Sequence, residues 1–311
     1  MKVQTGAEIH FLCKAAFAQT VRNNPFIDRI WTIDQHVKEV APALRKEGFD
    51  AVIDLHNNLR TKHLQLLLRN RFYAFPKLNL QKWLLCRFGI DRMPKELHLV
   101  DRYFKAVEPL GVQNDGLGLD YYFSSGVNRL SADASNSTLL AALPKTYIAW
   151  VLGATHPTKR LPSTKINRVL KQLNHPVVLL GGKDVEQEAL GIKSHENGQL
   201  INLVGKIKLE DSVAVMAKSA LVVSPDTGLM HIAAALEKPM VTVWGNTVPA
   251  FGMTPYYSSP IVKHHLLEVP NLPCRPCSKI GYMECPKKHF ACMEKQDENK
   301  LLKAIQDCLV P

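Results

Sequence analysis

Short apolar runs that alternate with helical patterns constrain this chain more than any other feature of its sequence. The runs are rich in β-branched and aromatic residues, and longer stretches with apolar residues at helical spacing separate them. In the first half, the expected strands are residues 8–13, 29–33, 50–55, 71–75 and 119–123. The expected helices are residues 15–23, 37–47, 59–69, 80–88 and 97–110. This alternation predicts βαβ units and a mainly parallel sheet, because parallel strands need a crossover connection that is usually a helix.

The pattern stops and restarts near the middle of the chain. Residues 124–138 are rich in Ser, Asn, Asp and Ala, which is typical of a linker, with a long surface loop as the alternative. The second half has expected strands at residues 147–152, 177–180, 200–204, 221–224 and 240–244. Its expected helices are residues 162–173, 185–192, 209–219, 227–236 and 295–309. Since 311 residues suffice for about two domains, we expect an α/β domain at residues 1–138, linker included, and another at residues 139–311.

The composition indicates a globular protein with anionic partners. Apolar residues make up 46% and charged residues 22%, which excludes a largely disordered chain. No apolar run reaches the roughly 18 residues that a spanning helix needs, and the first residues lack the apolar core of a signal peptide. A net charge of +11 favours nucleic acid, anionic membrane surfaces or phosphorylated substrates. Seven cysteines without a secretion signal indicate a reducing, cytoplasmic compartment.

Motifs of several large enzyme classes are absent from the sequence. It contains no G-x-G-x-x-G, no H-E-x-x-H and no G-x-S-x-G. The segment Gly181-Gly182-Lys183-Asp184 lacks both the spacing and the hydroxyl residue of a Walker A loop. The sequence therefore disfavours dinucleotide oxidoreductases, nucleoside-triphosphate hydrolases, metalloproteases and α/β-hydrolases.

The strongest group of candidate functional residues lies in residues 222–236. This segment reads VVSPDTGLMHIAAAL, and we expect a buried strand followed by a helix that Asp226 caps. Thr227 and Gly228 open this helix, and His231 follows one turn later on the face of Thr227. Free N–H groups and the positive helix end suit a diphosphate. The alternative interpretation is a well-capped core helix with a buried histidine.

Residues 226–236 resemble the signature of glycosyltransferase family 9, which contains the ADP-heptose:lipopolysaccharide heptosyltransferases. Residues 50–61, 153–162, 243–249 and 251–256 resemble further segments of this family, so the resemblance covers nearly the whole chain. It implies the α/β GT-B architecture, in which two Rossmann-like domains with mainly parallel sheets face a cleft. It also implies an inverting glycosyltransferase that requires no cofactor.

The resemblance implies a donor site in the second half of the chain. The implied donor-binding residues are Thr155, Lys159, Asp226, Thr227, Gly228, Leu229 and His231. The ammonium group of Lys159 would stabilise the negative charge that develops on the departing nucleoside diphosphate. The alternative for Lys159 is a solvated surface lysine.

The residues that the resemblance implies for the acceptor are His56, Asn57 and Arg60, just beyond an expected strand. An arginine there suits an acidic sugar or a phosphate, and a solvated loop arginine is the alternative. The implied reaction moves a heptose, or a related sugar, from ADP-heptose or another nucleoside-diphosphate sugar to a lipopolysaccharide core saccharide. The implied location is the cytoplasm, with peripheral contact at the anionic inner face of the inner membrane.

The start of the chain departs from the family pattern. Family members begin with a strand, a glycine-containing loop with an essential Asp, and a helix, and this Asp is the general base toward the acceptor hydroxyl. Residues 7–12 already resemble the second strand of the family, so the base role passes to no residue of this chain. We expect the base in a segment upstream of Met1, with a non-catalytic nucleotide-sugar-binding member of the family as the alternative.

Four cysteines near the C-terminus form a second candidate site, in a segment at residues 270–293. Cys274, Cys277, Cys285 and Cys292 lie within 19 residues, and four thiolates suit a tetrahedral zinc ion. Such an ion would hold the loop together rather than catalyse, because four protein ligands leave no open position. A redox-sensitive pair and packed free thiols are the alternatives.

A nucleic-acid-binding protein is a third hypothesis, prompted by the positive charge and the cysteines. The basic residues are scattered, however, and no platform of aromatic and basic residues is visible. We therefore expect a nucleoside-diphosphate sugar and a saccharide as partners, and no nucleic acid.

Overall fold

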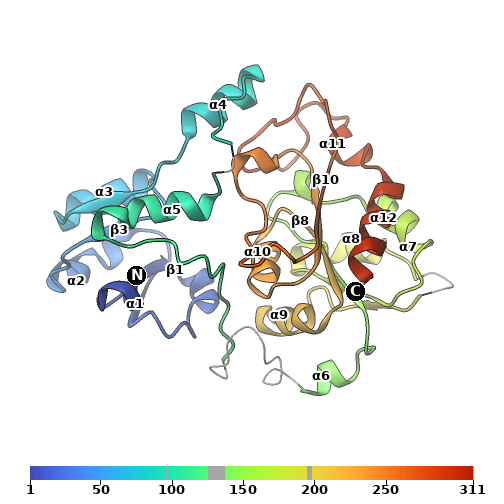
Figure 1. Cartoon of the computed structure of the whole chain (residues 1–311), viewed down its shortest axis with the longest axis horizontal. Coiled ribbons are helices and arrows are strands. Elements are labelled where there is room, and N and C mark those ends of the chain that lie inside the picture. The colour runs from blue at the N-terminus through green and yellow to red at the C-terminus, as the bar shows by residue number, and fades with distance from the viewer. Residues whose placement is uncertain (96, 125–136, 195–197, 311) are drawn as a thin grey trace.

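The computed structural model describes residues 1–95, 97–124, 137–194 and 198–310 (Figure 1). The predicted linker at residues 124–138 lies almost entirely outside these ranges. Figure 1 shows the first half of the chain, blue to green, beside the second half, green to red. Each half contains strands with helices packed around them.

The second half is built on one six-stranded sheet. Its strands are β5 (Ile148–Val151), β6 (Val177–Leu180), β7 (Leu200–Asn202), β8 (Leu221–Pro225), β9 (Met240–Trp244) and β10 (His264–Glu268). They pair in the order β10-β9-β8-β5-β6-β7, and every pair is parallel. The chain winds outward from β5 to β7, then returns to β8 on the other side of β5. Strands β5 and β8 therefore flank the point where the direction of winding reverses.

Helices cover both faces of this sheet, which is why its central strands are continuous apolar runs. In β5, Ile148 and Trp150 point into one core, whereas Ala149 and Val151 point into the other. The first core lies under α7 (Ser163–Leu170), α8 (Glu186–Leu190), α11 (Ala291–Glu294) and α12 (Glu298–Leu309). The second lies under α9 (Leu209–Lys218) and α10 (Gly228–Ala235).

Two details of the strand prediction are wrong. At residues 119–123 only a single bridge at Tyr122 forms, so the segment is extended but is not a strand. Its alternation has another cause, because Tyr121 and Phe123 are buried in the core beneath α9 and α10. Strand β10 escapes prediction because it is a half-exposed edge strand that includes His264 and Glu268.

The first half has two separate pairs of parallel strands rather than one continuous sheet. β1 (His10–Lys14) pairs with β2 (Arg29–Ile33), and β3 (Val52–Asp54) pairs with β4 (Phe72–Ala74). Of their residues only Ile33 and Asp54 are buried. The helices of this half are α1 (Lys2–Thr5), α2 (Ala41–Lys46), α3 (Leu59–Leu68), α4 (Asn79–Phe88) and α5 (Leu99–Val107). Helix α6 (Ser137–Ala141) precedes the second half.

Several connections are short 3-10 helices of one or two turns. They are η1 (Ala15–Thr20), η2 (Val37–Glu39), η3 (Glu108–Leu110), η5 (Pro157–Lys159), η6 (Lys183–Val185) and η7 (Pro249–Phe251). The first of these replaces the α-helix predicted at residues 15–23. In the part of the chain that the structure describes, no helix combines the length and apolar character needed to cross a bilayer.

The start of α5 joins the first half to the loop that follows β9. The backbone N–H of Leu99 donates to the Gly252 carbonyl at 2.6 Å. Nε2 of His98 contacts the Thr254 carbonyl at 2.7 Å, in the geometry of a donated hydrogen bond. These contacts hold the first turn of α5 against the second half, near the carboxyl ends of its strands.

Candidate functional site

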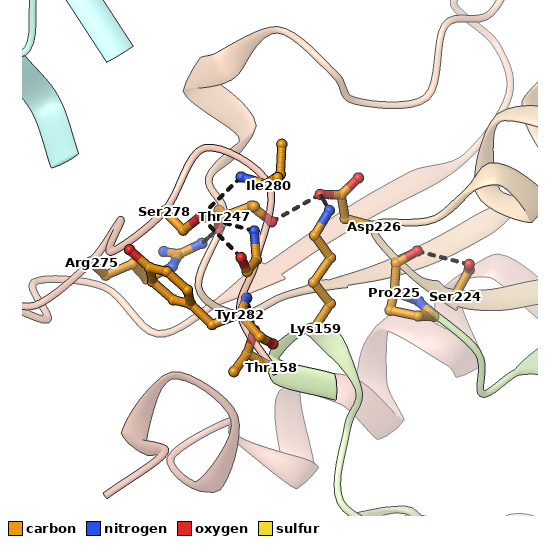
Figure 2. A network of polar contacts seen from close by, with 11 residues as sticks. Thr158, Lys159, Ser224, Pro225, Asp226, Thr247, Arg275, Ser278, Ile280 and Tyr282 are labelled. Carbon is orange, nitrogen blue, oxygen red and sulfur yellow. Dashed lines mark hydrogen bonds and ion pairs between the residues drawn. The ribbon is translucent and has the colours of Figure 1, made fainter. Parts of the chain in front are cut away.

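A polar cluster of the second half lies at the switch point of its sheet. Lys159 follows β5 and Asp226 follows β8, and these two strands are neighbours. Nζ of Lys159 lies 2.7 Å from Oδ2 of Asp226, and both side chains are largely shielded from solvent (Figure 2). Ligands of open α/β sheets bind in the crevice at this position. The ion pair therefore occupies the place where the fold itself favours a ligand.

Asp226 does not cap helix α10, so the predicted capping role is wrong. The N-cap residue is Thr227, and no side chain of the described residues caps the helix there. The Asp226 carboxylate accepts instead from Lys159 and, at 2.9 Å, from Oγ1 of Thr247. The ammonium group attracts the carboxylate with a full opposite charge, which a backbone N–H lacks. The positive end of α10 is thus left to other partners, and the space beside the Gly228 Cα is open.

His231 lies one turn into α10 and faces the same cluster. Burial lowers the pKa of His231, the Asp226 carboxylate opposes this effect, and His98 and Lys159 add to the lowering. The imidazole is therefore neutral at pH 7, with one nitrogen that donates and one that accepts. Since His98 precedes α5 of the first half, His231 lies where the two halves meet.

The other predicted donor residues lie around this point. Thr227 and Leu229 are half-buried at the start of α10, and Thr155 is exposed in the turn after β5. Among the contacts of residues 137–194 and 198–310, none joins Thr155 to the ion pair. The structure thus brings together the α10 residues and Lys159, with Thr155 on the outer side.

A loop from the cysteine-rich segment supports the ion pair from two sides (Figure 2). Nη2 of Arg275 donates to the Thr247 carbonyl at 2.9 Å, and Thr247 in turn bonds the carboxylate of the pair. The backbone N–H of Tyr282 donates to Oγ1 of Thr158 at 2.8 Å, and this hydroxyl donates to the Tyr282 carbonyl at 2.8 Å. Because Thr158 directly precedes the lysine, the loop positions both partners of the pair.

The predicted acceptor residues lie in the first half, between β3 and α3. Oδ1 of Asp54 accepts from the backbone N–H groups of His56 at 2.9 Å and Asn57 at 2.7 Å. Nζ of Lys77 donates to the carbonyls of the same two residues at 3.0 and 3.2 Å. Arg60 is exposed in the first turn of α3. No hydrogen bond or ion pair of the described chain joins this loop to the donor cluster.

The sequence analysis missed two buried cations, Lys82 and Arg102, between the halves. Nη2 of Arg102 donates to the Phe251 carbonyl at 2.9 Å, but its Nε and Nη1 have no partner among the residues described. Nζ of Lys82 lies 5.4 Å from the centre of the Phe251 ring. Burial, followed by the charges of Arg102 and Lys279, lowers the pKa of Lys82 to about 8. One available signal is that Arg102 lies on the apolar face of α5, four residues before Ala106.

Comparison with known protein families decides where this chain belongs. The family model described as glycosyltransferase family 9 (heptosyltransferase) matches residues 37–284, which is more than half of the chain. The chain belongs to glycosyltransferase family 9. The resemblance inferred from residues 226–236 is therefore confirmed, and the protein is a glycosyltransferase by family.

Curated relatives of this family 9 glycosyltransferase agree with the assignment. Lipopolysaccharide heptosyltransferase 1 of Campylobacter coli is 21% identical over 273 residues, which are 79% of this chain and 77% of the relative. Lipooligosaccharide heptosyltransferase 2 of Haemophilus ducreyi is 36% identical over 121 residues, which are 36% of this chain and 34% of the relative. The higher of these two sequence identities thus applies to only 36% of this chain.

Solved structures of family 9 proteins share the fold. A family 9 glycosyl transferase from Veillonella parvula superposes with a TM-score of 0.72 at 21% identity, over 97% of this chain and 88% of that chain. ADP-heptose lipopolysaccharide heptosyltransferase II of E. coli superposes with a TM-score of 0.70 at 19% identity, over 99% and 92%. The predicted GT-B fold is confirmed.

In this family 9 member, the four predicted metal ligands line one small cavity with His289. Sγ of Cys274 lies 3.8 Å from Nε2 of His289. Burial and the neighbouring thiols raise the pKa of Cys277 to about 11 and that of Cys292 to about 12. Over the described ranges, no group of three or more His, Cys, Asp or Glu side chains is arranged to hold a metal ion. The zinc site at Cys274, Cys277, Cys285 and Cys292 stays a prediction.

Proposed function

We propose that this protein transfers a heptose from ADP-heptose to a saccharide of the lipopolysaccharide core, with inversion at the anomeric carbon. The observation that carries the proposal is the Lys159–Asp226 ion pair at the switch point, beside the start of α10. Relatives named as lipopolysaccharide heptosyltransferases, and the solved ADP-heptose lipopolysaccharide heptosyltransferase II of E. coli, support this choice of substrates.

The donor diphosphate would lie between Nζ of Lys159 and the first N–H groups of α10. A helix N-terminus attracts anions, and a lysine adds a full point charge. Because Asp226 holds Nζ at 2.7 Å, the cation is already in place before negative charge develops on the leaving diphosphate. Neutral His231 would donate to a phosphate or sugar oxygen of the same ligand.

An anionic acceptor would fit the buried cations between the halves. The two nitrogen atoms of Arg102 that lack a described partner would donate charge-assisted bonds to a carboxylate or a phosphate. Lys82 is close enough to affect this site, since the charge of Arg102 contributes to the lowered pKa of Lys82. Arg60 would meet the same acceptor from the surface of α3.

In the transfer, the acceptor hydroxyl oxygen forms a bond to the anomeric carbon as the bond from that carbon to the diphosphate oxygen breaks. The electron pair leaves with ADP, and the hydroxyl proton passes to a base. Attack from the face opposite the diphosphate inverts the configuration. We assign the base to no described residue.

Calorimetric titration with ADP-heptose, ADP, UDP and GDP tests the donor site. We expect selective binding of ADP and ADP-heptose, and we expect Lys159→Ala to weaken both by at least about tenfold, or about 1.4 kcal/mol. Lys171→Ala is the matched control, because Lys171 is an exposed lysine at the far end of α7.

Three outcomes would each contradict a different part of the proposal. Unchanged affinity in Lys159→Ala would remove Lys159 from the site, whereas a preference for UDP or GDP would replace the nucleotide. A folded wild-type protein that binds no nucleotide would overturn the donor site altogether. The transfer itself is read from ADP release with a heptose-deficient lipopolysaccharide core as acceptor.

A further inference from the structure

Helix α4 departs from the usual pattern of a surface helix, in which apolar side chains are buried and charged side chains face water. Its Lys82 is buried, whereas Leu80 and Trp83 are 65% and 50% exposed. Residues three apart share a helix face, so these two side chains form one outward stripe. Phe88 and Ile90 extend it and are also exposed, and the Phe88 ring meets the Trp83 ring edge-on at 5.2 Å. The side of α4 that points to solvent therefore carries large apolar side chains, with Asn79 and Arg87 beside them.

A second group of exposed apolar side chains comes from the cysteine-rich loop of the other half. Ile280 is 62% exposed and Met283 is 69% exposed. The residue before Ile280, Lys279, places Nζ 3.4 Å from Oδ1 of Asn79 at the start of α4. The two groups are therefore neighbours although they lie far apart in the sequence. Figure 1 shows α4 at the outer end of the first half, away from its strands.

We name this area the docking surface and define it by six side chains. They are Leu80, Trp83, Phe88, Ile90, Ile280 and Met283. Several exposed large apolar residues in one place mark an interaction site more often than scattered single ones do. The presence of Trp83 also matters, because tryptophan is enriched at the interfaces of lipid bilayers.

Positive charge surrounds the docking surface. Apart from the buried Lys82, residues 77–95 contain four Lys or Arg and one Asp, which is a net charge of +3. Residues 279–288 contain three Lys and one Glu, which is a net charge of +2. Apolar side chains ringed by cations are the pattern of a protein that lies on an anionic bilayer, where the apolar groups enter the interface and the cations meet lipid headgroups.

We propose that the docking surface binds an anionic lipid bilayer. A second copy of this chain is the weaker alternative, because a two-fold contact would bring the same cations of both copies together. The docking itself does not depend on the proposed function. Its consequence does: Lys77 precedes α4 and holds the carbonyls of His56 and Asn57, so a docked α4 would bring the acceptor loop to the membrane that carries the acceptor.

Vesicle co-sedimentation tests the proposal with the chain of residues 1–311. The vesicles are phosphatidylcholine alone, or phosphatidylcholine and phosphatidylglycerol in equal parts. We expect binding to the anionic vesicles that weakens with added salt, and weak binding to the neutral ones. The double variant Leu80→Ser with Trp83→Ser should lower the affinity at least about tenfold, because the apolar stripe is lost.

The matched control is the double variant Leu66→Ser with Leu190→Ser. Both leucines are exposed, on α3 and α8, and neither belongs to the docking surface. The control should bind vesicles as the wild type does, and both double variants should bind ADP with unchanged affinity. ADP titration thus reports the donor site separately from the docking.

The proposal fails if the folded wild type does not bind anionic vesicles, or if the docking variant binds them as well as the wild type. It also fails if light scattering finds a dimer that only the docking variant dissociates, since a second copy would then be the occupant. As a second readout, vesicles should shift the wild-type tryptophan emission to the blue. A Trp83→Phe variant should bind without this shift, because the chain's other tryptophans lie outside the docking surface.

Discussion

The two halves of the molecule bury charge in opposite ways. In the second half, the largely shielded Lys159 pairs with Asp226 at 2.7 Å, and the buried Lys165 pairs with Glu298 at 2.8 Å. In the first half, Lys82 and Arg102 are buried without an acidic partner among the residues that the structure describes. The difference teaches that acids of the same half balance these two lysines of the second half, whereas no acid among the described residues balances the two buried cations of the first half.

The same contrast holds for the packing of the strands. Every residue of β5, β6, β8 and β9 is buried. In β1 to β4, only Ile33 and Asp54 are buried. Because buried apolar area is the main source of stability, the second half should be the more stable unit.

The largest expected effect tests this difference in packing. Trp150→Ala removes a ring that is 2% exposed at the centre of the sheet, and we expect a loss of about 3–5 kcal/mol in the free energy of unfolding. Trp31→Ala removes a half-buried ring on β2, and we expect a loss of about 1–2 kcal/mol. Urea denaturation followed by circular dichroism measures both. Equal losses of unfolding free energy in the two variants would contradict the inferred difference in packing between the halves.

A smaller effect tests the unpaired charge of the first half. Lys82→Met should raise the free energy of unfolding at pH 7 by about 1–3 kcal/mol, because folding buries the ammonium group beside Arg102. The pKa of Lys82 falls from 10.5 to about 8 on folding, so the unfolded chain binds more protons between these values. The stability of the wild type should therefore rise with pH across this window.

The variant should lack this contribution to the rise. Urea denaturation at pH 7 and at pH 10 measures it, with Lys62→Met as the control because Lys62 is exposed on α3. If the proposed function holds, Lys82→Met should also weaken binding of the acceptor, whereas the affinity for ADP should stay the same. A variant less stable than the wild type at pH 7 would show that the charge is compensated.

The smallest effect tests how firmly the two halves are joined. Oη of Tyr256 in the second half donates to Oδ1 of Asp101 in the first half at 3.0 Å and accepts from Asn114 at 2.8 Å. Tyr256→Phe removes both bonds, and we expect a loss of about 1 kcal/mol. Tyr73→Phe on β4 is the control, with an expected change within about 0.5 kcal/mol. Thermal unfolding compares the two, and an equal response would mean that the Tyr256 bonds do not join the halves.

Much of the fold follows from patterns that the sequence carries locally. Strands β6 and β9 match their predicted ranges, and α9 and α10 lie within a residue of theirs at each end. These elements are buried on both faces or amphipathic, so their apolar period is strong. The prediction failed at β10 because this edge strand is half-exposed and lacks a strong apolar period. It failed at residues 119–123 because their alternation reflects packing against the core and not pairing in a sheet.

In the candidate site, too, the sequence predicted some features and missed others. The strand and helix around residues 226–236 were predictable, because a helix start after a buried strand is a local pattern and the family signature is contiguous. That this segment and Lys159 bind the donor stays a prediction. The capping role of Asp226 was predicted wrongly, because Thr247 and Lys159 compete for its carboxylate from other loops. The partners His98 and Arg102 escaped prediction, since only folding brings α5 to the second half.

The sequence by itself therefore determined the alternation of strands and helices, the family and the position of the signature segment at residues 226–236. These depend on periodicity and on contiguous residues, which the chain carries before it folds. Only the tertiary structure decided which charges are paired and which are left open, and where the exposed face of α4 lies. Pairing and exposure depend on distances between residues far apart in the chain, and those distances exist only after the two halves have packed.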